Sequence, residues 1–361
     1  MTVYLLAGGG TAGHVNPLLA TADRLRDRDP GATVLVLGTA EGLEARLVPS
    51  RGYELLTIPR TPFPRRPNGD LLRFPGRWRA TIAATRAHLR DRRVDVVVGF
   101  GGYASAPAYR AARREGVPIA VHEANARPGL ANRLGARLTR FVGVTFASTR
   151  LRHARVVGFP LRAEIERLDR AASRDAGARE FGLDAAVPTL LVTGGSSGAK
   201  RINDTVVEAA AVITGTGWQV LHLSGGLRGT IADPQSAGYR LVEYTDRMDL
   251  ALAASDLAIS RAGSATVSEL AAVGLPAVFV PYPVGNGEQA LNARDAVDAG
   301  GAVLVRDAEF TPGWIASTLV PLLRDRARVA DMAPRIASVG HRDGADRMVD
   351  LVLAARDARR R

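Results

Sequence analysis

The sequence predicts an α/β protein of two similar domains, each a parallel β-sheet covered by helices on both faces. Short apolar runs alternate with segments of helical length along all 361 residues, a pattern typical of parallel sheets. A chain this long exceeds what one hydrophobic core usually serves. Two glycine clusters, at 8–13 and 194–198, each follow an apolar run near the start of one half.

The apolar runs are the strand candidates. Residues 1–7 have no basic segment and run directly into glycines, which favours a first strand over a signal peptide. Helical segments such as Asn16–Asp27 and Ala104–Glu115 separate later runs. Those runs are Thr33–Gly38, Val94–Gly99, Pro118–His122, Phe141–Val144, Thr189–Thr193, Gln219–Leu223, Leu257–Ser260 and Ala277–Val280. Ligands of such sheets bind at the carboxyl ends of strands, so the motifs after each run matter most.

The amino-acid composition excludes several classes of protein and of binding site. The chain has no cysteine, which excludes disulfides and thiolate metal sites. No uncharged apolar stretch is long enough to span a bilayer, and we expect a cytoplasmic protein. The net charge is +12, and residues 60–93 carry ten arginines against two aspartates, a local charge of +8. Charge this concentrated indicates an anionic partner surface. Nucleic acid is the weaker explanation, because it leaves both glycine clusters without a role.

The first glycine cluster satisfies G-x-G-x-x-G after a strand, which raises a dinucleotide-binding dehydrogenase as one alternative. Such an enzyme needs an acidic residue at the end of the second strand. Here that strand ends Leu37-Gly38-Thr39, with Glu41 displaced into the loop. His14 follows the cluster, where an imidazole of near-neutral pKa could act as a general base or could merely cap the turn.

The segment Ser260–Glu269 follows a strand and opens a helix. Small residues there let backbone N–H groups approach a phosphate, whose charge the helix dipole favours. Glu269 could then accept hydrogen bonds from a ribose, although Thr266-x-x-Glu269 also fits a capping box. Gly194–Gly198 is a second phosphate cradle, and Lys200 lacks the spacing of an ATPase loop.

A polar cluster at Gly285–Asn292 follows another strand and suits the hydroxyls of a sugar. Arg162 lies just beyond Gly158-Phe159-Pro160, where we place the join between domains. It could reach a phosphate or remain a solvated charge.

Six segments, taken in order, resemble the MurG family, the peripheral membrane enzymes that add N-acetylglucosamine to lipid I to make lipid II. The family has the GT-B fold, with two Rossmann-like domains facing each other across a cleft. The resemblance implies an acceptor- and membrane-binding domain at 1–159, a UDP-sugar domain at 160–337 and a terminal helix at 338–361 that crosses back to the first domain. The segments are Gly9–Pro17, Gly99–Tyr103, His122–Ala126, Gly194–Ala199, Arg261–Glu269 and Glu288–Ala293.

The resemblance also implies roles for residues that match the family's motifs. Asn125 matches a donor-sugar contact, Thr245 falls where backbone meets uracil, and Glu269 matches the ribose carboxylate. Three positions depart from frequent family residues, since Ala12, Ala124 and Ser197 stand where Gly, Gln and Gln are often found. The UDP-N-acetylglucosamine site implied by the resemblance comprises Thr11, Ala12, Gly13, Asn125, Arg162, Ser196, Thr245, Ser264, Ala265, Thr266, Glu269, Gln289 and Asn292.

The implied reaction turns an α-linked donor into a β(1→4) product, so it requires a single inverting displacement. His14 is the first candidate for the base and Glu123 the second. Asp27-Arg28-Asp29 is a literal D-x-D motif, but it precedes Pro30 at a helix end. We therefore expect no metal and no cofactor, with the leaving diphosphate stabilised by the helix start at Ser264–Thr266 and by Arg162.

The basic segment 60–93 then acquires a role at the anionic inner leaflet of the cell membrane. Trp78, Ile82 and Leu89 lie on one helical stripe among Arg77, Arg79, Arg86 and Arg90. Apolar anchors among arginines suit a helix on anionic lipid, and the alternative is that Trp78 and Ile82 face the core. Further apolar anchors are expected in the loop before this helix, at Phe63, Leu71, Leu72 and Phe74.

We therefore expect a peripheral protein on the cytoplasmic side of the membrane, acting on UDP-N-acetylglucosamine and lipid I and not on nucleic acid. Two alternatives share the donor half. One is another GT-B transferase that acts on a lipid or natural product. The other is a UDP-N-acetylglucosamine 2-epimerase, an isomerase that needs no acceptor.

Overall fold

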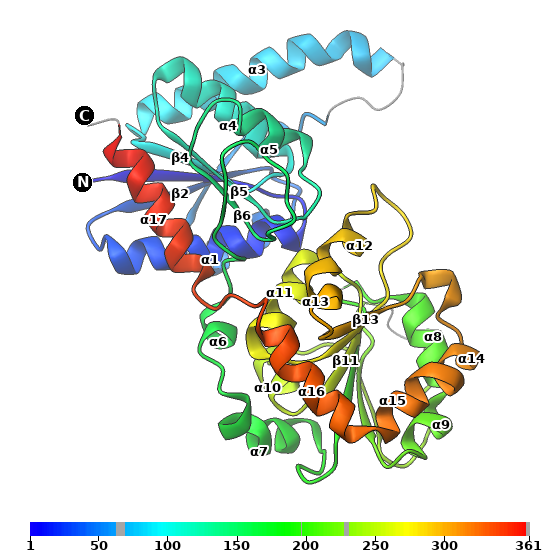
Figure 1. The fold of residues 1–361 in the computed structure, drawn as a ribbon. Helices are drawn as coiled ribbons and strands as arrows, with labels where there is room; N and C mark the ends of the chain where they lie inside the picture. The colour runs from blue at the N-terminus through cyan, green and yellow to red at the C-terminus, as the bar shows by residue number, and fades with distance from the viewer. Residues whose placement is uncertain (63–68, 196, 227–230, 359–361) are drawn as a thin grey trace. The chain divides into compact units, whose positions relative to one another are not determined.

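The computed structural model describes residues 1–62, 69–195, 197–226 and 231–358, and gives only the backbone of 69–71 (Figure 1). The chain forms two compact units. Unit 1 comprises Met1–Arg162 and Arg342–Arg361, and unit 2 comprises Ala163–His341. The chain therefore leaves unit 1 two residues after Pro160, where the sequence indicated a join, and returns to it for the last helix.

The sheet of unit 1 has parallel strands in the order β3-β2-β1-β4-β5-β6-β7. Chain order reverses between the adjacent strands β1 and β4, and this is the switch point of a doubly wound sheet. The strands are β1 (Val3–Ala7), β2 (Thr33–Gly38), β3 (Glu54–Thr57), β4 (Val96–Gly99), β5 (Ile119–Glu123), β6 (Val142–Val144) and β7 (Ala154–Val156).

Helices cover both faces of this sheet, as Figure 1 shows for α3 and α4 on one face and α1 and α17 on the other. Alternate residues of a strand point to opposite faces. Leu5 accordingly packs in the core under α3 and α4, and Tyr4 and Leu6 pack in the core under α1 and α17. The helices of unit 1 are α1 (Ala12–Arg28), α2 (Glu44–Ser50), α3 (Gly69–Asp91), α4 (Gly102–Glu115), α5 (Leu130–Gly135) and α17 (Gly344–Asp357).

Unit 2 repeats the arrangement with the strand order β10-β9-β8-β11-β12-β13, again all parallel. Its switch point lies between β8 and β11. The strands are β8 (Thr189–Thr193), β9 (Gln219–Leu223), β10 (Tyr239–Val242), β11 (Leu257–Ser260), β12 (Ala277–Phe279) and β13 (Ala302–Leu304).

The helices of unit 2 are mostly short. Alternating residues of its central strands, such as Leu190 and Val192, pack with α8, α9, α15 and α16 in one buried core. The helices are α6 (Ala163–Glu166), α7 (Arg170–Phe181), α8 (Lys200–Glu208), α9 (Ala210–Thr214), α10 (Met248–Ala253), α11 (Ser264–Val273), α12 (Glu288–Asn292), α13 (Arg294–Asp298), α14 (Pro312–Trp314), α15 (Val320–Arg324) and α16 (Arg326–Ala337), with a 3₁₀ turn at Asp307–Glu309 and a π-helical segment at Ile315–Leu319.

Every strand that the apolar runs predicted is present, and each bound agrees within two residues. The four remaining strands, β3, β7, β10 and β13, are the edges of the two sheets. The predicted doubly wound α/β architecture is therefore confirmed, and its central strands are the ones that the sequence revealed.

Candidate active site

The glycine motifs of unit 1 lie at the carboxyl edge of its sheet. Gly8–Gly10 follow β1, Gly101 follows β4, and Ala124–Gly129 follow β5. Because these three strands are adjacent and parallel, their loops leave the sheet side by side at the switch point, where such sheets bind ligands. The structure brings six predicted site residues to this edge: Thr11, Ala12, Gly13, His14, Glu123 and Asn125.

The two glycine loops approach each other so closely that side chains would not fit. A Cβ on Gly102 would lie 2.4 Å from the Gly9 carbonyl oxygen, and one on Gly101 would lie 2.9 Å from Cδ2 and Nε2 of His14. Both glycines also have positive φ, 95° at Gly101 and 79° at Gly102, where other residues are strained. The glycines therefore bring the backbone of one loop against the imidazole of the other.

Helix α1 begins at Ala12, four residues before the predicted start, because the helix accommodates Pro17 in its interior instead of beginning beside it. The first turn thus contains Ala12, Gly13 and His14, with Thr11 as the exposed N-cap in extended conformation. Helix N-termini attract anions through their unpaired N–H groups and dipole. This placement is compatible with the predicted contacts to donor phosphates.

The hydrogen bonds of His14 select one tautomer. Its Nδ1 lies 3.1 Å from the Gly9 carbonyl oxygen and 3.2 Å from Thr11 Oγ1. A carbonyl oxygen only accepts, so Nδ1 carries the proton and donates it. The neutral ring then has its lone pair on Nε2, on the edge that faces Gly101.

The pKa of His14 is lowered from its ordinary value of 6.5, and burial of the ring is the main cause. The carboxylate of Glu123, the hydrogen bond with Gly9 and the carboxylate of Glu44 oppose this shift without cancelling it. At neutral pH the imidazole is therefore uncharged and able to accept a proton at Nε2.

Glu123, the second candidate base, is buried and fully engaged by its own loop. Its Oε1 accepts from the Asn125 N–H at 2.9 Å, and its Oε2 accepts from the Gly129 N–H and from Asn132 Nδ2, both at 3.0 Å. Asn132 also binds Tyr109 Oη through its Oδ1 at 2.7 Å. This geometry favours a role in shaping the loop that presents Asn125. The sequence analysis did not single out Asn132.

Glu44, at the start of α2, is a second residue that the sequence analysis missed. Its side chain is buried beneath the first glycine loop, and Oε2 accepts from the Gly10 N–H at 2.8 Å. Oε1 accepts from the N–H and Oγ1 of Thr39, at 2.9 and 2.8 Å. The Glu44 carboxylate is therefore enclosed by backbone, and it is not available to hold the ribose of a dinucleotide.

In unit 2, the segment predicted to bind a diphosphate lies at the corresponding switch point. Helix α11 begins at Ser264 directly after β11, with Gly263 as the N-cap. Ser264, Ala265 and Thr266 therefore form its first turn. Because Thr266 is the third helical residue and not the cap, the alternative of a Thr266-x-x-Glu269 capping box is wrong. Glu269 lies half-buried one turn further along.

The predicted sugar-side amides, Gln289 and Asn292 on α12, are fastened to the loop before α11. The Oε1 of Gln289 accepts from the N–H of Ala262 at 3.2 Å and from that of Tyr282 at 2.9 Å. Nδ2 of the buried Asn292 donates to the Ala262 carbonyl at 3.2 Å. Both residues thus hold the loops after β11 and β12 together.

Arg261 and Asp307 make further contacts with the segments around the Ala262 loop. The sequence analysis assigned neither residue a separate role. Arg261 Nη1 donates to the carbonyls of Val280 and Pro281 and forms an ion pair with Asp307 at 2.5 Å. Asp307 also lies 3.8 Å from Arg201 of α8. These contacts connect the helix starts that follow β8 and β11.

Three predicted donor contacts remain, at Thr245, Arg162 and Ser196. Thr245 follows β10 at the same edge of the sheet, where its Oγ1 accepts from the Arg247 N–H at 2.9 Å. Arg162 is the last residue of unit 1. Ser196 lies outside the described residues. The structure does not assemble these three with the α11 and α12 residues in one described site.

The literal D-x-D motif lies at the opposite edge of the unit 1 sheet. Asp27 is near the end of α1, and Asp29 caps it, just before β2 begins. Asp29 accepts from Tyr4 Oη at 3.1 Å and pairs with Arg356 of α17 at 3.4 Å. Its carboxylate thus fastens the terminal helix. Across the described ranges, no group of three or more His, Cys, Asp or Glu side chains could hold a metal ion.

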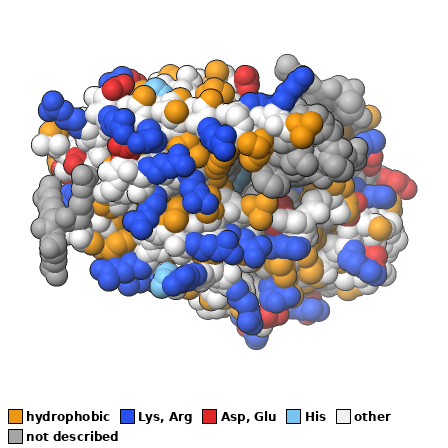
Figure 2. Space-filling view, turned by 90° about the horizontal axis from the view of Figure 1, so that it is seen from above, with side chains coloured by type: hydrophobic (Ala, Val, Ile, Leu, Met, Phe, Trp, Pro, Cys, Tyr) orange, Lys and Arg blue, Asp and Glu red, His pale blue; other side chains and the backbone are white. Residues whose placement is uncertain are grey.

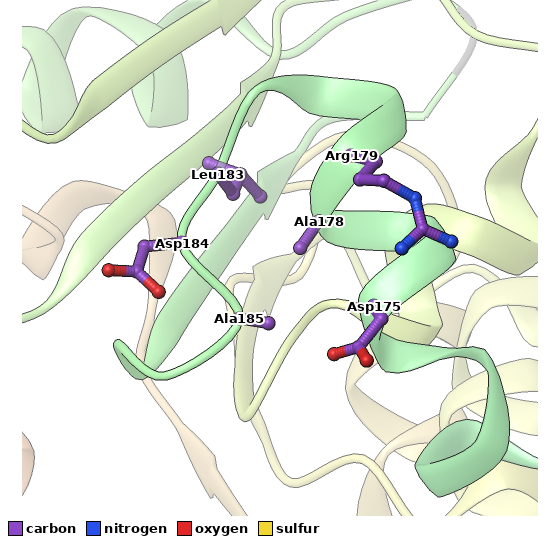
Figure 3. A pocket seen from close by; sticks show the side chains of 6 residues that line it. All are labelled: Asp175, Ala178, Arg179, Leu183, Asp184 and Ala185. Carbon is purple, nitrogen blue, oxygen red and sulfur yellow. The ribbon is translucent and has the colours of Figure 1, made fainter.

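A surface pocket of about 560 Å³ lies elsewhere in unit 2, between the end of α7 and the loop that leads into β8 (Figure 3). That loop enters the amino end of the strand, so the pocket is on the side away from the α11 start. Its lining carries the opposed charges of Asp175, Asp184 and Arg179. None of the predicted site residues that the structure describes contributes to it.

The structure of helix α3 shows that part of the membrane prediction is wrong. It begins at Gly69, so Leu71, Leu72 and Phe74 lie in its first turns and not in a loop, and Pro75 lies inside it. Ile82 and Leu89 are buried in the core, and Trp78 packs partly against that core. The stripe of Trp78, Ile82 and Leu89 therefore faces the protein, not lipid.

Of the other expected anchors, Leu72 is 86% exposed. Phe74 is half-buried and stacks on Trp78 with ring centroids 5.7 Å apart. Phe63 and the side chain of Leu71 lie outside the described part of the chain.

The arginines of α3 divide into two sets. Arg86 and Arg90 pair with Glu115 of α4, at 2.5 and 2.7 Å, so part of the local charge is neutralised. Arg73, Arg77 and Arg79, nearer the helix start, are exposed. Figure 2 looks onto the side that carries α3, where basic side chains outnumber acidic ones. No described helix has the length and apolar character needed to cross a membrane.

Comparison with known proteins decides the family. Residues 4–144 match the N-terminal domain of glycosyltransferase family 28, and residues 189–348 match its C-terminal domain. A protein of Leifsonia xyli, named UDP-N-acetylglucosamine–N-acetylmuramyl-(pentapeptide) pyrophosphoryl-undecaprenol N-acetylglucosamine transferase, is 65% identical over 98% of both chains. The crystal structure of Acinetobacter baumannii MurG superposes with a TM-score of 0.81 at 28% identity, covering 98% of this chain and 100% of that one. The chain belongs to the MurG family.

The MurG assignment confirms the resemblance that the six sequence segments carried, and with it the GT-B fold. The fold alone extends further. The calicheamicin glycosyltransferase CalG4 superposes with a TM-score of 0.65 at 20% identity over 98% of each chain. The natural-product transferase alternative thus shares the architecture, whereas the near-full-length identity lies with the MurG relatives.

Proposed function

We propose that the protein transfers N-acetylglucosamine from UDP-N-acetylglucosamine to the 4-hydroxyl of the N-acetylmuramyl unit of lipid I, with inversion, giving lipid II for peptidoglycan. The name of the 65% identical relative supports these substrates. The observation that carries the chemistry is His14, a neutral imidazole whose Nδ1 is bound to Gly9 and whose Nε2 edge faces Gly101 at the switch point of unit 1.

Unit 2 would bind the donor. The N-terminus of α11 presents the backbone N–H groups of its first turn, a favourable environment for the two negative phosphates. Glu269, one turn on, is suited to accept from the ribose hydroxyls. Gln289 and Asn292 keep the Ala262 loop in place, and Gln289, the less buried of the two, would meet the sugar.

Unit 1 would bind the acceptor and provide the base. The 4-hydroxyl of the acceptor becomes nucleophilic when Nε2 of His14 takes its proton, and the new bond forms at C1 as the bond to the diphosphate breaks. Glu123 is the weaker candidate, because its oxygens already accept three N–H hydrogen bonds, from Asn125, Gly129 and Asn132. In this account it positions Asn125 and favours the transient charge on His14.

The diphosphate that leaves would be stabilised by the α11 start and by Arg162. Asp27 and Asp29 are not expected to hold a metal there, since Asp29 is engaged with Tyr4 and Arg356 at the other edge of the sheet. We expect activity to persist in excess chelator. Loss of activity that only a divalent ion restores would contradict this part of the proposal.

The decisive experiment measures UDP release from UDP-N-acetylglucosamine with and without a soluble lipid I analogue. We expect release only with the analogue, together with a β-linked disaccharide. Sugar isomerisation without acceptor would indicate the epimerase alternative. Turnover on a different acceptor would keep the donor site and contradict the choice of lipid I.

Substitution then tests the base. His14→Ala should lower kcat by roughly 10²–10⁴-fold, the usual contribution of general-base catalysis, with little change in the KM for the donor. His153→Asn is the matched control, because His153 is an exposed histidine of the same unit. Equal kcat for both variants would remove His14 from the mechanism.

We also propose that the first turns of α3 contact the anionic inner leaflet of the membrane, which makes the protein peripheral on the cytoplasmic side. Exposed Leu72 with Arg73, Arg77 and Arg79 supports this narrower site. Reversing these three arginines to Glu should weaken sedimentation with anionic liposomes. Reversing Arg86 and Arg90, which pair with Glu115, should weaken it less, and equal effects would contradict the assignment.

A further inference from the structure

The buried carboxylate of Glu44 has a set of contacts that the reaction described above does not use. Its side chain is 1% exposed, and it is hydrogen-bonded to backbone groups and a hydroxyl of unit 1. Oε2 accepts from the Gly10 N–H, and Oε1 accepts from the N–H and Oγ1 of Thr39. It therefore connects the loop after β1 to the loop after β2.

Three glycines enclose this carboxylate. A Cβ on Gly9, Gly38 or Gly42 would lie 2.1–2.5 Å from the nearest atom of the Glu44 side chain. None of the three has positive φ, so close approach, and not backbone conformation, explains the absence of a side chain at these positions. The loops are built around the carboxylate.

The contact with Gly10 reaches the catalytic imidazole through a single peptide group. The N–H of Gly10 and the carbonyl of Gly9 belong to the same planar unit, in which they point in opposite directions. Glu44 accepts from that N–H at 2.8 Å, and Nδ1 of His14 donates to that carbonyl at 3.1 Å. A carboxylate, a peptide group and an imidazole thus form one hydrogen-bonded chain.

From this chain of contacts we infer that Glu44 is a positioning residue for His14, and that it acts through the Gly9–Gly10 peptide group. By fixing the plane of that peptide, Glu44 aims the Gly9 carbonyl at Nδ1. The carbonyl then holds the proton on Nδ1 and leaves the lone pair on Nε2. Polarisation along the chain strengthens the carbonyl as an acceptor. The inference rests on the proposed role of His14 as the base.

Other charged and titratable groups also face His14 and must be separated from Glu44. Glu123, at the end of β5, acts on the ring directly through its charge, and His122 lies on the same strand. Glu44 differs from both, because it alone is hydrogen-bonded to the peptide that holds Nδ1. A change in the His14 tautomer when Glu44 is substituted therefore identifies the hydrogen-bonded relay through the Gly9–Gly10 peptide group.

The test is Glu44→Gln, with Glu41→Gln as the control. Both substitutions remove one negative charge from the segment just after β2, but Glu41 is exposed. A glutamine has one acceptor oxygen, so it cannot serve Gly10 and Thr39 as the carboxylate does. We expect kcat to fall about ten- to hundredfold, the usual cost of losing an orienting partner, with donor KM within about twofold. The acid limb of kcat should move to lower pH.

Nitrogen-15 NMR of the histidine rings provides a readout that does not depend on activity. The His14 signals are assigned by their loss in His14→Gln. In the native protein we expect a protonated Nδ1 and an unprotonated Nε2, and in Glu44→Gln a mixture of tautomers. A failure of His14→Ala to lower kcat would contradict the proposed function, whereas the tautomer shift would still support the relay.

An unchanged tautomer together with native kcat in folded Glu44→Gln would overturn the inference. So would an equal loss in Glu41→Gln. Should thermal melting show that Glu44→Gln does not fold, Glu44→Asp replaces it, because the shorter side chain keeps the charge but cannot span Gly10 and Thr39. The same tautomer shift is expected there, and its absence would overturn the relay.

Discussion

Gly101 offers a sharp test of how the backbone positions the proposed base. It is the N-cap of α4, with φ 95° and ψ −171°, a region that only glycine populates readily and that costs other residues about 1–3 kcal/mol. The Cβ introduced by Gly101→Ala would lie 2.9 Å from Nε2 and Cδ2 of His14. The ring must then move by about half an ångström to restore ordinary contact.

The size of the activity loss follows from that displacement. A misplacement of 1 Å in a reacting group costs on the order of 10²-fold, so half that distance predicts a kcat about tenfold lower. The strain predicts a separate loss of stability. At about 2–4 °C per kcal/mol for units of this size, the melting temperature should fall by several degrees.

Gly116 is the matched control, because it is the C-cap of the same helix. Its φ of 67° is also positive, but a Cβ there meets nothing within 4 Å. Gly116→Ala should therefore lower the melting temperature, through about 1–2 kcal/mol of left-handed strain, without lowering kcat. UDP release and thermal melting of both variants decide the matter. A folded Gly101→Ala with native kcat would refute the placement of His14 at the reacting centre.

Three further predictions follow from other contacts. Burial lowers the pKa of His122 and of His222 to about 4, so the unfolded chain binds more protons between pH 6.5 and 4. Thermal stability should therefore fall across that window on acidification, by up to about 3 kcal/mol for each histidine, and His222→Phe should flatten the profile. Gln289→Ala should raise the donor KM roughly tenfold, because the backbone N–H groups of Ala262 and Tyr282 lose their acceptor, as donor titration would show. Asp346→Asn, which breaks the pairing of α17 with Arg24, should lower the melting temperature by a few degrees and leave kcat unchanged.

Burial explains which strands the sequence revealed. β1, β4, β8 and β11 are buried along their whole length, so both faces need apolar residues and the run is continuous. The edge strand β7 is exposed at all three positions, and β3 has a single buried residue. Edge strands pair on one side only, and β3 and β7 are not marked by a long apolar run. The sequence could not predict which surroundings the apolar face of α3 contacts, because a periodic stripe does not specify whether core or lipid covers it.

The sequence predicts those parts of the candidate site whose residues lie close together in the chain. Glycine clusters and small residues after a strand indicate a close backbone approach, and His14 and the α11 start were predicted from that signal. The capping-box alternative failed by three residues, because helix starts cannot be read from side chains when glycine is the cap. Glu123 was found, but its engagement with Asn125, Gly129 and Asn132 depends on loop geometry that the sequence does not encode in any short pattern.

Glu44, which the sequence analysis missed, and Gln289, which it assigned to the sugar, share a physical role. A loop of glycines reaches close to its neighbours but has no side chains to hold its position, so another element must provide the acceptors. In unit 1 Glu44, in the first turn of α2, joins the loops after β1 and β2. In unit 2 Gln289, in the first turn of α12, joins the loops after β11 and β12. Each unit thus fastens the loop at its switch point with a side-chain oxygen from the next helix, so the loop and the residue that holds it have to be considered together.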